Sequence, residues 1–418
     1  MNTSRRDFLK TLSTGTSLSL LSLISPINAR FTEKLDEKFA TKNSLSSKDY
    51  SLSDNVRYLN HGSIGTIPKI VQEAHQEYLA MCETNPWFYM WSGEWDKPIQ
   101  EVRSKVASYI NADIDEISFP HNTTEVYNLL ALGLDLKKGD EVLFCNLNHA
   151  GASIPFHIHS KKRGYSVKVF DIPTDNIASI TTQNVVDLYD ANITDKTKLI
   201  VMPHIDNTFG LRHPVKEISK LARSKGVEFI SIDTAQTMGM IPIDVKDLDI
   251  DVIGTSAHKW IQAPKGVSLA YFSKRIQDHI DPISVTWGQS QWQDSARKFE
   301  DYGTRNLPEV LTLGHALDFQ QRIDPLAREK KLKELWKHAK SLTSKNPLTE
   351  WRSPEEWELG GSLFVIELKN HTPSEFAKKA FTNYGIVFRA FDNHSTIRIS
   401  PNTFNTKEEL NQLFGLIV

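Results

Sequence analysis

One lysine, one aspartate and a pair of threonines lie next to apolar segments of this sequence. Lys259 ends the stretch Ser256-Ala257-His258-Lys259, which follows an apolar run, and Asp233 ends another such run. Thr123 and Thr124 precede an apolar helical stretch. A lysine amine can form a Schiff base with a carbonyl group, and a carboxylate can keep a pyridine nitrogen protonated. Hydroxyls and amides at a helix N-terminus bind phosphate.

The apolar runs beside these residues are expected to be buried strands. They alternate with helical patterns from residue 66 onward, which is typical of an α/β fold with a mainly parallel sheet and helices on both faces. The expected strands are 141–145, 166–172, 198–205, 228–233, 251–255 and 267–272. Ligands bind beyond the carboxyl ends of such strands, so Lys259, Asp233 and the hydroxyls should meet at one edge. Pyridoxal 5′-phosphate (PLP) requires this combination of groups.

The order of the elements changes near residue 320, which predicts two domains. Residues 51–320 are expected to form the large PLP-binding domain, with its N-terminal segment near the small domain. Residues 321–418 begin with a long charged helix at 324–344. They continue with a strand at 362–368, a helix at 374–384, strands at 386–391 and 396–400, and a final helix from 406. This order predicts a smaller C-terminal α+β domain.

The first 29 residues have the layout of an export signal. A positive start is followed by a short apolar stretch and by the small residue Ala29. The adjacent Arg5 and Arg6, with Phe8 and Leu9 behind them, indicate the twin-arginine route. We therefore expect the twin-arginine translocase as a partner during export and a periplasmic location for the mature protein. Residues 30–50 are polar and are expected to form a linker.

The composition excludes several classes of protein. The chain has 418 residues, of which 39% are hydrophobic and 24% charged, as in ordinary globular proteins. Lys plus Arg number 49 and Asp plus Glu 51, so no basic excess points to nucleic acid. The only cysteines, Cys82 and Cys145, are too few for a disulfide framework or a four-thiolate zinc site. We expect neither a metal site nor a nucleic-acid partner.

Six short stretches of the chain resemble the class V family of fold-type-I PLP enzymes, particularly the branch that includes isopenicillin N epimerase. They occur in family order, and only their combination is specific. They are Tyr58-Leu59-Asn60-His61-Gly62-Ser63-Ile64-Gly65, Asn122-Thr123-Thr124-Glu125, Asp233-Thr234-Ala235-Gln236, Ser256-Ala257-His258-Lys259, Gly303-Thr304-Arg305 and Arg398-Ile399-Ser400. The resemblance implies the fold-type-I architecture and PLP as cofactor.

The resemblance also implies roles at the cofactor ring. Lys259 would form the Schiff base with PLP and then move protons, and Asp233 would pair with the pyridinium nitrogen. Gln236 and Asn207 would hydrogen-bond the phenolic oxygen of PLP. His149 would stack on the ring, although a strand-end histidine with a structural role fits the same spacing.

Further residues are assigned by the resemblance to the phosphate and to the substrate. The phosphate would be held by Thr123, Thr124, Ser256 and His258, although plain helix capping could explain either threonine. Thr304 would reach the phosphate of the other subunit in a homodimer, although a structural role in a turn fits nearly as well. Arg398 would bind the substrate carboxylate as a fork, with His61 and Gly62 nearby. Arg389 could assist Arg398 or serve a structural role.

The sequence leaves the reaction at the substrate open. Transamination, epimerisation, and cleavage or modification of a side chain of an amino acid or peptide all fit. Cysteine desulfurases of this family need a nucleophilic cysteine on the loop before the carboxylate-binding arginine, whereas residues 391–396 contain none. Persulfide-based desulfurase activity is therefore not expected. A cysteine lyase without this thiol and a non-catalytic PLP-fold binding protein stay open.

Overall fold

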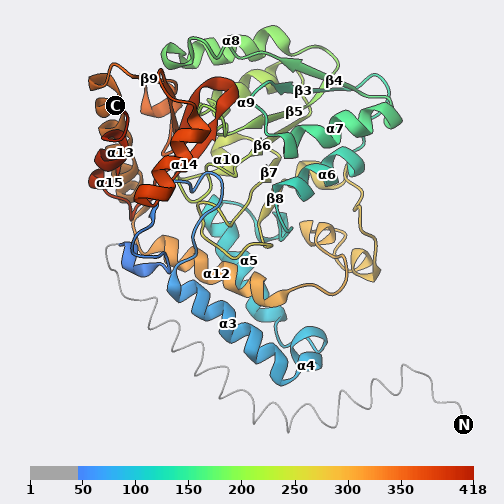
Figure 1. The fold of residues 1–418 in the computed structure, drawn as a ribbon. Coiled ribbons are helices and arrows are strands. Elements are labelled where there is room, and N and C mark those ends of the chain that lie inside the picture. The colour runs from blue at the N-terminus through green and yellow to red at the C-terminus, as the bar shows by residue number, and fades with distance from the viewer. Residues whose placement is uncertain (1–45) are drawn as a thin grey trace, which may run out of the picture. The chain divides into compact units, whose positions relative to one another are not determined.

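A seven-stranded sheet organises the large domain, and strands β3 to β8 of this sheet are labelled in Figure 1. The computed structural model describes residues 46–418, so the expected export signal lies outside the described residues. The strand order is β2-β8-β7-β6-β5-β3-β4. The pairs between β4 and β7 are parallel, and β8 is antiparallel to β7 and β2. The strands are β2 (Ile117–Ser118), β3 (Glu141–Cys145), β4 (Ser166–Phe170), β5 (Thr197–Pro203), β6 (Phe229–Asp233), β7 (Val252–Gly254) and β8 (Ala270–Phe272). The predicted mainly parallel sheet is confirmed.

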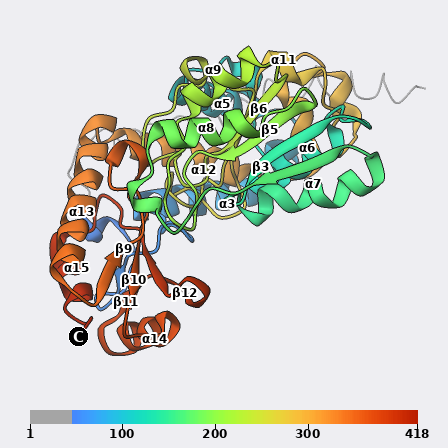
Figure 2. The ribbon, with the colours of Figure 1, turned by 90° about the horizontal axis from the view of Figure 1, so that it is seen from above.

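Helices cover both faces of this sheet (Figure 2). Val142 and Phe144 of β3 pack in one core cluster with residues of α6 and α7. Leu143, between them, is also fully buried and points to the opposite face because side chains alternate along a strand. The helices of the large domain are α3 (Lys69–Thr84), α4 (Pro86–Trp91), α5 (Asp96–Ile110), α6 (Thr123–Gly133), α7 (Ala150–Arg163), α8 (Thr182–Asn192), α9 (Val215–Ser224), α10 (Val245–Leu248), α11 (Lys274–Gln277) and α12 (Leu307–Gln321). None of the described helices is long and apolar enough to span a membrane.

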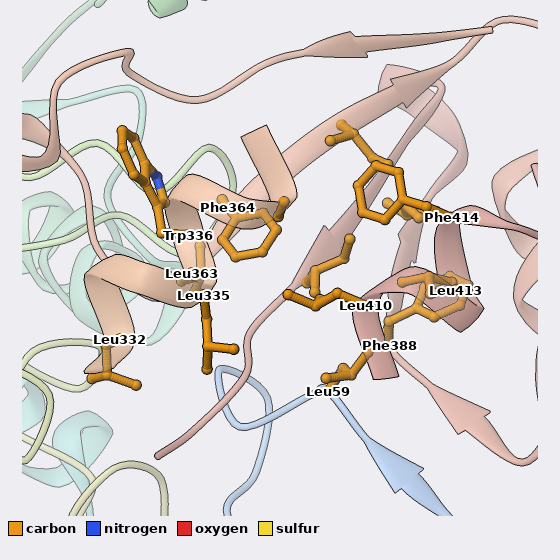
Figure 3. Close-up of a cluster of buried hydrophobic side chains, with 14 of the residues drawn as sticks. Leu59, Leu332, Leu335, Trp336, Leu363, Phe364, Phe388, Leu410, Leu413 and Phe414 are labelled. Carbon is orange, nitrogen blue, oxygen red and sulfur yellow. The ribbon is translucent and has the colours of Figure 1, made fainter. Parts of the chain in front are cut away.

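The C-terminal part forms a four-stranded antiparallel sheet in the order β12-β13-β10-β9. Trp336, Phe364 and Phe414 belong to its core, which joins the sheet to the helices (Figure 3). The strands are β9 (Thr349–Trp351), β10 (Phe364–Leu368), β12 (Arg389–Phe391) and β13 (Thr396–Ile399), and the helices are α13 (Pro325–Lys345), α14 (Pro373–Tyr384) and α15 (Lys407–Phe414).

The segment before the large sheet contacts the small domain. β1 (Arg57–Tyr58) pairs in parallel with β11 (Ile386–Val387), and Leu59 lies in the core of the small domain (Figure 3). The single strand expected at 386–391 is therefore split, because β11 pairs with β1 and β12 pairs with β13. Tyr50 differs from the expected linker: it is 2% exposed and packs on Phe404.

Candidate active site

A cavity lies at the carboxyl ends of β5, β6 and β7 and at the first turns of α6 and α7. It is lined by Thr123, Thr124, His149, Pro203, Ile205, Asn207, Asp233, Ala235, Gln236, Ser256 and Lys259. Eight of these are residues that the sequence singles out. Pro203, Ile205 and Ala235 were not foreseen, because apolar residues at strand ends carry no sequence signal that separates cavity walls from core.

Lys259 is held at the cavity by a short turn after β7. Its backbone N–H donates to the carbonyl of Ser256 at 3.2 Å. The chain at Gly65 packs tightly on this turn, since a Cβ at Gly65 would lie 2.0 Å from the carbonyl oxygen of Lys259. Burial lowers the pKa of Lys259 to about 8, with the charge of Asp233 opposing this effect and that of Arg398 adding to it. The amine is therefore partly neutral near pH 8 and able to act as a nucleophile.

Asp233 and His149 face the same cavity from β6 and α7. The Oδ1 of Asp233 accepts from the N–H of Ala235 at 2.9 Å, and burial raises the pKa of the carboxyl while nearby Lys259 opposes the rise. His149 caps α7, where its Nδ1 accepts from the N–H of Gly151 at 3.1 Å. Burial lowers the pKa of His149. A neutral imidazole whose Nδ1 accepts carries its hydrogen on Nε2.

Hydroxyl groups gather at the N-terminus of α6. The Oγ1 of Thr123 and the Oγ of Ser256 are 2.8 Å apart. Asn122 caps the helix by accepting from the N–H of Glu125 at 3.1 Å. Capping therefore does not explain either threonine. Hydroxyls and first-turn amides at the positive end of a helix dipole form a site for a phosphate group.

Gln236 and Asn207 complete the wall of the cavity. The Oε1 of Gln236 accepts from the indole N–H of Trp260 at 3.0 Å, and its Nε2 donates to the carbonyl of Gly62 at 2.7 Å. The amide Nε2 carries two hydrogens, so a second N–H of Gln236 is left for a ligand. Trp260 is a positioning residue that the sequence analysis missed, although it directly follows Lys259.

Arg398 lies on β13 beside this cavity and is 3% exposed. Its Nη1 donates to the backbone carbonyl of Asn207 at 2.7 Å, and its Nη2 donates to the Oγ of Ser63 at 2.6 Å. The buried Nε has no partner among the described residues. Burial lowers the pKa of Arg398 to about 10, and the nearby Arg389 adds to this effect.

Asp206, which the sequence analysis missed, shapes the loop that Arg398 contacts through the carbonyl of Asn207. Its two carboxylate oxygens accept from the N–H groups of Thr208, Phe209 and Leu211 at 2.6–2.8 Å. Burial raises the pKa of Asp206 to about 6, while these hydrogen bonds oppose the rise. An aspartate whose side chain binds amides two or more residues ahead is a turn signal, so the stretch Asp206-Asn207-Thr208-Phe209-Gly210 could have revealed this turn.

Five expected site residues do not line the cavity. Gly62 lies just behind it, hydrogen-bonded to Gln236. His61 is fully buried among Tyr58, Trp260 and Phe404, so its ring does not line the cavity in the conformation described. The remaining three are His258, Thr304 and Arg398.

His258 and Thr304 lie on segments that the sequence singles out but do not line the cavity. The carbonyl of His258 accepts from the N–H of Gly65 at 2.9 Å, and burial lowers the pKa of its imidazole to about 4. Thr304 lines a separate pocket together with Trp91 and Arg305. Within one chain, Thr304 therefore does not reach the cavity at Lys259.

A comparison with models of protein families identifies the family of this chain. A model described as Aminotransferase class-V matches residues 57–413, which is most of the chain. The chain belongs to the class V aminotransferase family. Members of this family are PLP-dependent enzymes, and this chain is one of them.

Several known proteins resemble this class V enzyme over nearly their whole length. A probable cysteine desulfurase of Methanothermobacter thermautotrophicus is 28% identical, covering 87% of this chain and 94% of the relative. Isopenicillin N epimerase of Streptomyces clavuligerus is 25% identical with the same coverage. The apo structure of a cysteine desulfurase from Thermococcus onnurineus superposes with a TM-score of 0.78 at 24% identity, covering 88% of this chain and 96% of that chain. At this identity, the structural match supports the fold alone.

The groups that line the cavity of this class V enzyme fit PLP. The amine of Lys259 suits the carbonyl carbon of PLP, and the carboxylate of Asp233 suits its ring nitrogen. The hydroxyls of Thr123 and Ser256 at the start of α6 suit its phosphate. PLP, when bound, supplies an electron-withdrawing ring that weakens the bonds at the α-carbon of an amino acid.

The chain's own residues supply the rest of the chemistry. The Nζ of Lys259, with its pKa of about 8, can take up and return a proton at the substrate α-carbon. The guanidinium of Arg398 is held in place by Asn207 and Ser63 and can fix a carboxylate, so that one bond of the α-carbon is aligned for cleavage.

Proposed function

We propose that this enzyme acts at the α-carbon of an amino acid or peptide substrate with a free α-carboxylate, by transamination, epimerisation, or cleavage or modification of the side chain. The observation that carries the proposal is the buried guanidinium of Arg398 beside the cavity. No carboxylate of the described residues forms an ion pair with Arg398, and the nearby Asp206 uses its oxygens on backbone amides. A buried charge without a counter-ion is costly, and a substrate carboxylate would supply the counter-ion.

The test is to incubate the purified PLP-loaded enzyme with a panel of L- and D-amino acids and peptide amines. The visible absorption of the bound cofactor reports binding. Oxo-acid formation identifies transamination, appearance of the opposite enantiomer identifies epimerisation, and a truncated product identifies cleavage. If peptides without a free α-carboxylate react while free amino acids leave the absorption unchanged, the proposed substrate class is wrong.

A second candidate is cleavage of a carbon–sulfur bond, which the likeness to cysteine desulfurases favours. The structure offers no exposed thiol for a persulfide route among the described residues, because Cys82 and Cys145 are both buried. Burial raises the pKa of Cys145 to about 12 and also raises the pKa of Cys82. The loop 391–396 contains no cysteine. Sulfur chemistry would therefore be a lyase reaction that needs no enzyme thiol.

We expect activity to be independent of both thiols. A Cys82→Ser, Cys145→Ser double variant should retain the turnover of the wild type within about twofold, once the folded fraction is corrected for, because a protonated buried thiol is a poor nucleophile. Product formation and circular dichroism of the two proteins are the measurements. A well-folded double variant that binds substrate but forms no product would contradict the expectation.

Arg398→Lys should lower kcat/KM by about 10²-fold or more. Lysine keeps the charge but cannot form two parallel hydrogen bonds with a carboxylate, so the reacting bond would be misaligned. The content of bound PLP should stay unchanged, because Arg398 does not line the cavity that fits the cofactor. Steady-state kinetics and cofactor absorbance test both parts, and a silent substitution would show that the substrate has no carboxylate at this position.

We further propose export by the twin-arginine route and a homodimer, both of which rest on the sequence. An Arg5→Lys, Arg6→Lys double variant should leave the precursor in the cytoplasm, as fractionation would show. Normal export of the double variant would contradict the proposed export route.

In a homodimer, Thr304 of one subunit could serve the other subunit's phosphate site, since it does not reach the site of its own chain. A monomeric mass by light scattering, in a preparation with full cofactor content, would contradict the proposed homodimer.

A further inference from the structure

A second arginine stands directly opposite Arg398 in the small-domain sheet. Arg389 of β12 and Arg398 of β13 are Cα partners in an antiparallel pair. Side chains of directly opposed residues project from the same face, with their Cβ atoms about 4.5–5.5 Å apart. The two cations therefore share one face of the sheet, at the side of the cavity where Arg398 contacts Asn207.

One aromatic ring links the two guanidinium groups. Phe391 lies two residues after Arg389 and so projects from the same face. The Cζ of Arg389 is 5.6 Å from the centroid of the Phe391 ring, and the Cζ of Arg398 is 5.7 Å from it. This places two positive groups around a small apolar surface.

Arg389 is exposed and Arg398 is buried, and two like charges directly opposite each other in a sheet are unfavourable. Arg389 lowers the pKa of Arg398, second only to burial as a cause. Three acids of this region have other partners. Asp206 binds three backbone amides, Asp392 accepts from the N–H of Ser374 at 2.8 Å, and Glu367 of β10 forms an ion pair with Arg352. Among the described residues, no ion pair involves Arg389 or Arg398, so the pair is left for a ligand.

We propose that the substrate carries a second carboxylate, which Arg389 binds while Arg398 holds the α-carboxylate. The substrate would thus be an acidic amino acid of the aspartate or glutamate type, with its methylene groups against Phe391. This inference rests on the proposed role of Arg398 in the binding of an α-carboxylate. It adds the substrate class, which that role alone does not determine.

Equilibrium binding of simple carboxylates tests this subsite without any turnover. Calorimetry on the PLP-loaded enzyme would compare glutarate, which has two carboxylates, with valerate, which has one at the same chain length. A charge-assisted hydrogen bond contributes about 1.5–3 kcal/mol, so glutarate should bind at least about tenfold more tightly than valerate. Arg389→Gln should reduce this preference to about twofold or less and leave the affinity for valerate unchanged.

Two variants separate the subsite from general charge effects. Lys378→Gln removes one positive charge from an exposed position on α14 of the same domain and should leave the preference for glutarate intact. Arg389→Lys should restore part of the preference, because lysine keeps the charge without the fork. Equal affinity of the wild type for the two ligands, or equal weakening of both by Arg389→Gln, would overturn the inference.

The same binding measurements distinguish a failure of the second carboxylate subsite from a failure of the proposed function. If valerate binds and Arg398→Lys weakens it, while glutarate has no advantage, the α-carboxylate role stands and the second subsite fails. If valerate does not bind and Arg398→Lys leaves kcat/KM unchanged, the role of Arg398 in binding the α-carboxylate itself fails. A preference for glutarate that depends on Arg389 supports both.

Discussion

Replacement of Lys259 by alanine is expected to abolish covalent attachment of PLP and to lower turnover by about 10³-fold or more. Lys259 is the only lysine that lines the described cavity. Its lowered pKa of about 8 makes a neutral amine accessible near physiological pH. The variant loses both the nucleophile that attaches the cofactor and the group that moves a proton at the substrate α-carbon.

Borohydride reduction followed by peptide mass analysis measures the attachment, and steady-state kinetics measures the turnover. Lys265→Ala is a matched control, because Lys265 is an exposed lysine of the same loop that does not line the cavity. The control should keep the reduced cofactor on Lys259 and nearly full activity. Wild-type turnover in Lys259→Ala would contradict the assignment of this lysine.

The sheet and the position of Lys259 could be predicted because they depend on local patterns. A run such as Glu141–Cys145 has every residue buried, as a strand covered on both faces requires, and it is easily recognised. Asp233, at the end of such a run, had to lie at the carboxyl edge of the sheet. The polar part of the cavity lining therefore followed from strand ends and from family motifs, whereas its apolar part did not.

Other features depend on contacts between distant segments and left no local signal. The split of 386–391 into β11 and β12 follows from the pairing of β11 with Arg57–Tyr58, more than 300 residues away in the chain. His61 precedes Gly62, which contacts Gln236 of the cavity wall, but the ring of His61 is enclosed by Trp260 and Phe404. Burial lowers the pKa of His61 to about 3, which suits an internal position rather than contact with a charged substrate.

Asp233→Asn is expected to lower kcat by about 10²- to 10³-fold while PLP stays attached to Lys259. The substitution preserves shape, and an amide oxygen can still accept from the N–H of Ala235, as Oδ1 of Asp233 does at 2.9 Å. The amide cannot act as the counter-charge of a protonated ring nitrogen, so the ring withdraws electrons from the substrate less strongly. Cofactor absorbance and kcat on the same preparation measure the two parts of the prediction.

The pKa of Lys259 separates an electrostatic role of Asp233 from a structural one. The carboxylate of Asp233 raises the pKa of Lys259 against the larger effect of burial, because a negative charge stabilises the ammonium form. Asp233→Asn should therefore shift the pKa of Lys259 in the cofactor-free protein further below its value of about 8. The pH dependence of the labelling of Lys259 by an amine-reactive reagent would show a lower midpoint, with an unchanged melting temperature. An unchanged midpoint together with a large loss of thermal stability would show that Asp233 mainly supports the fold at the end of β6.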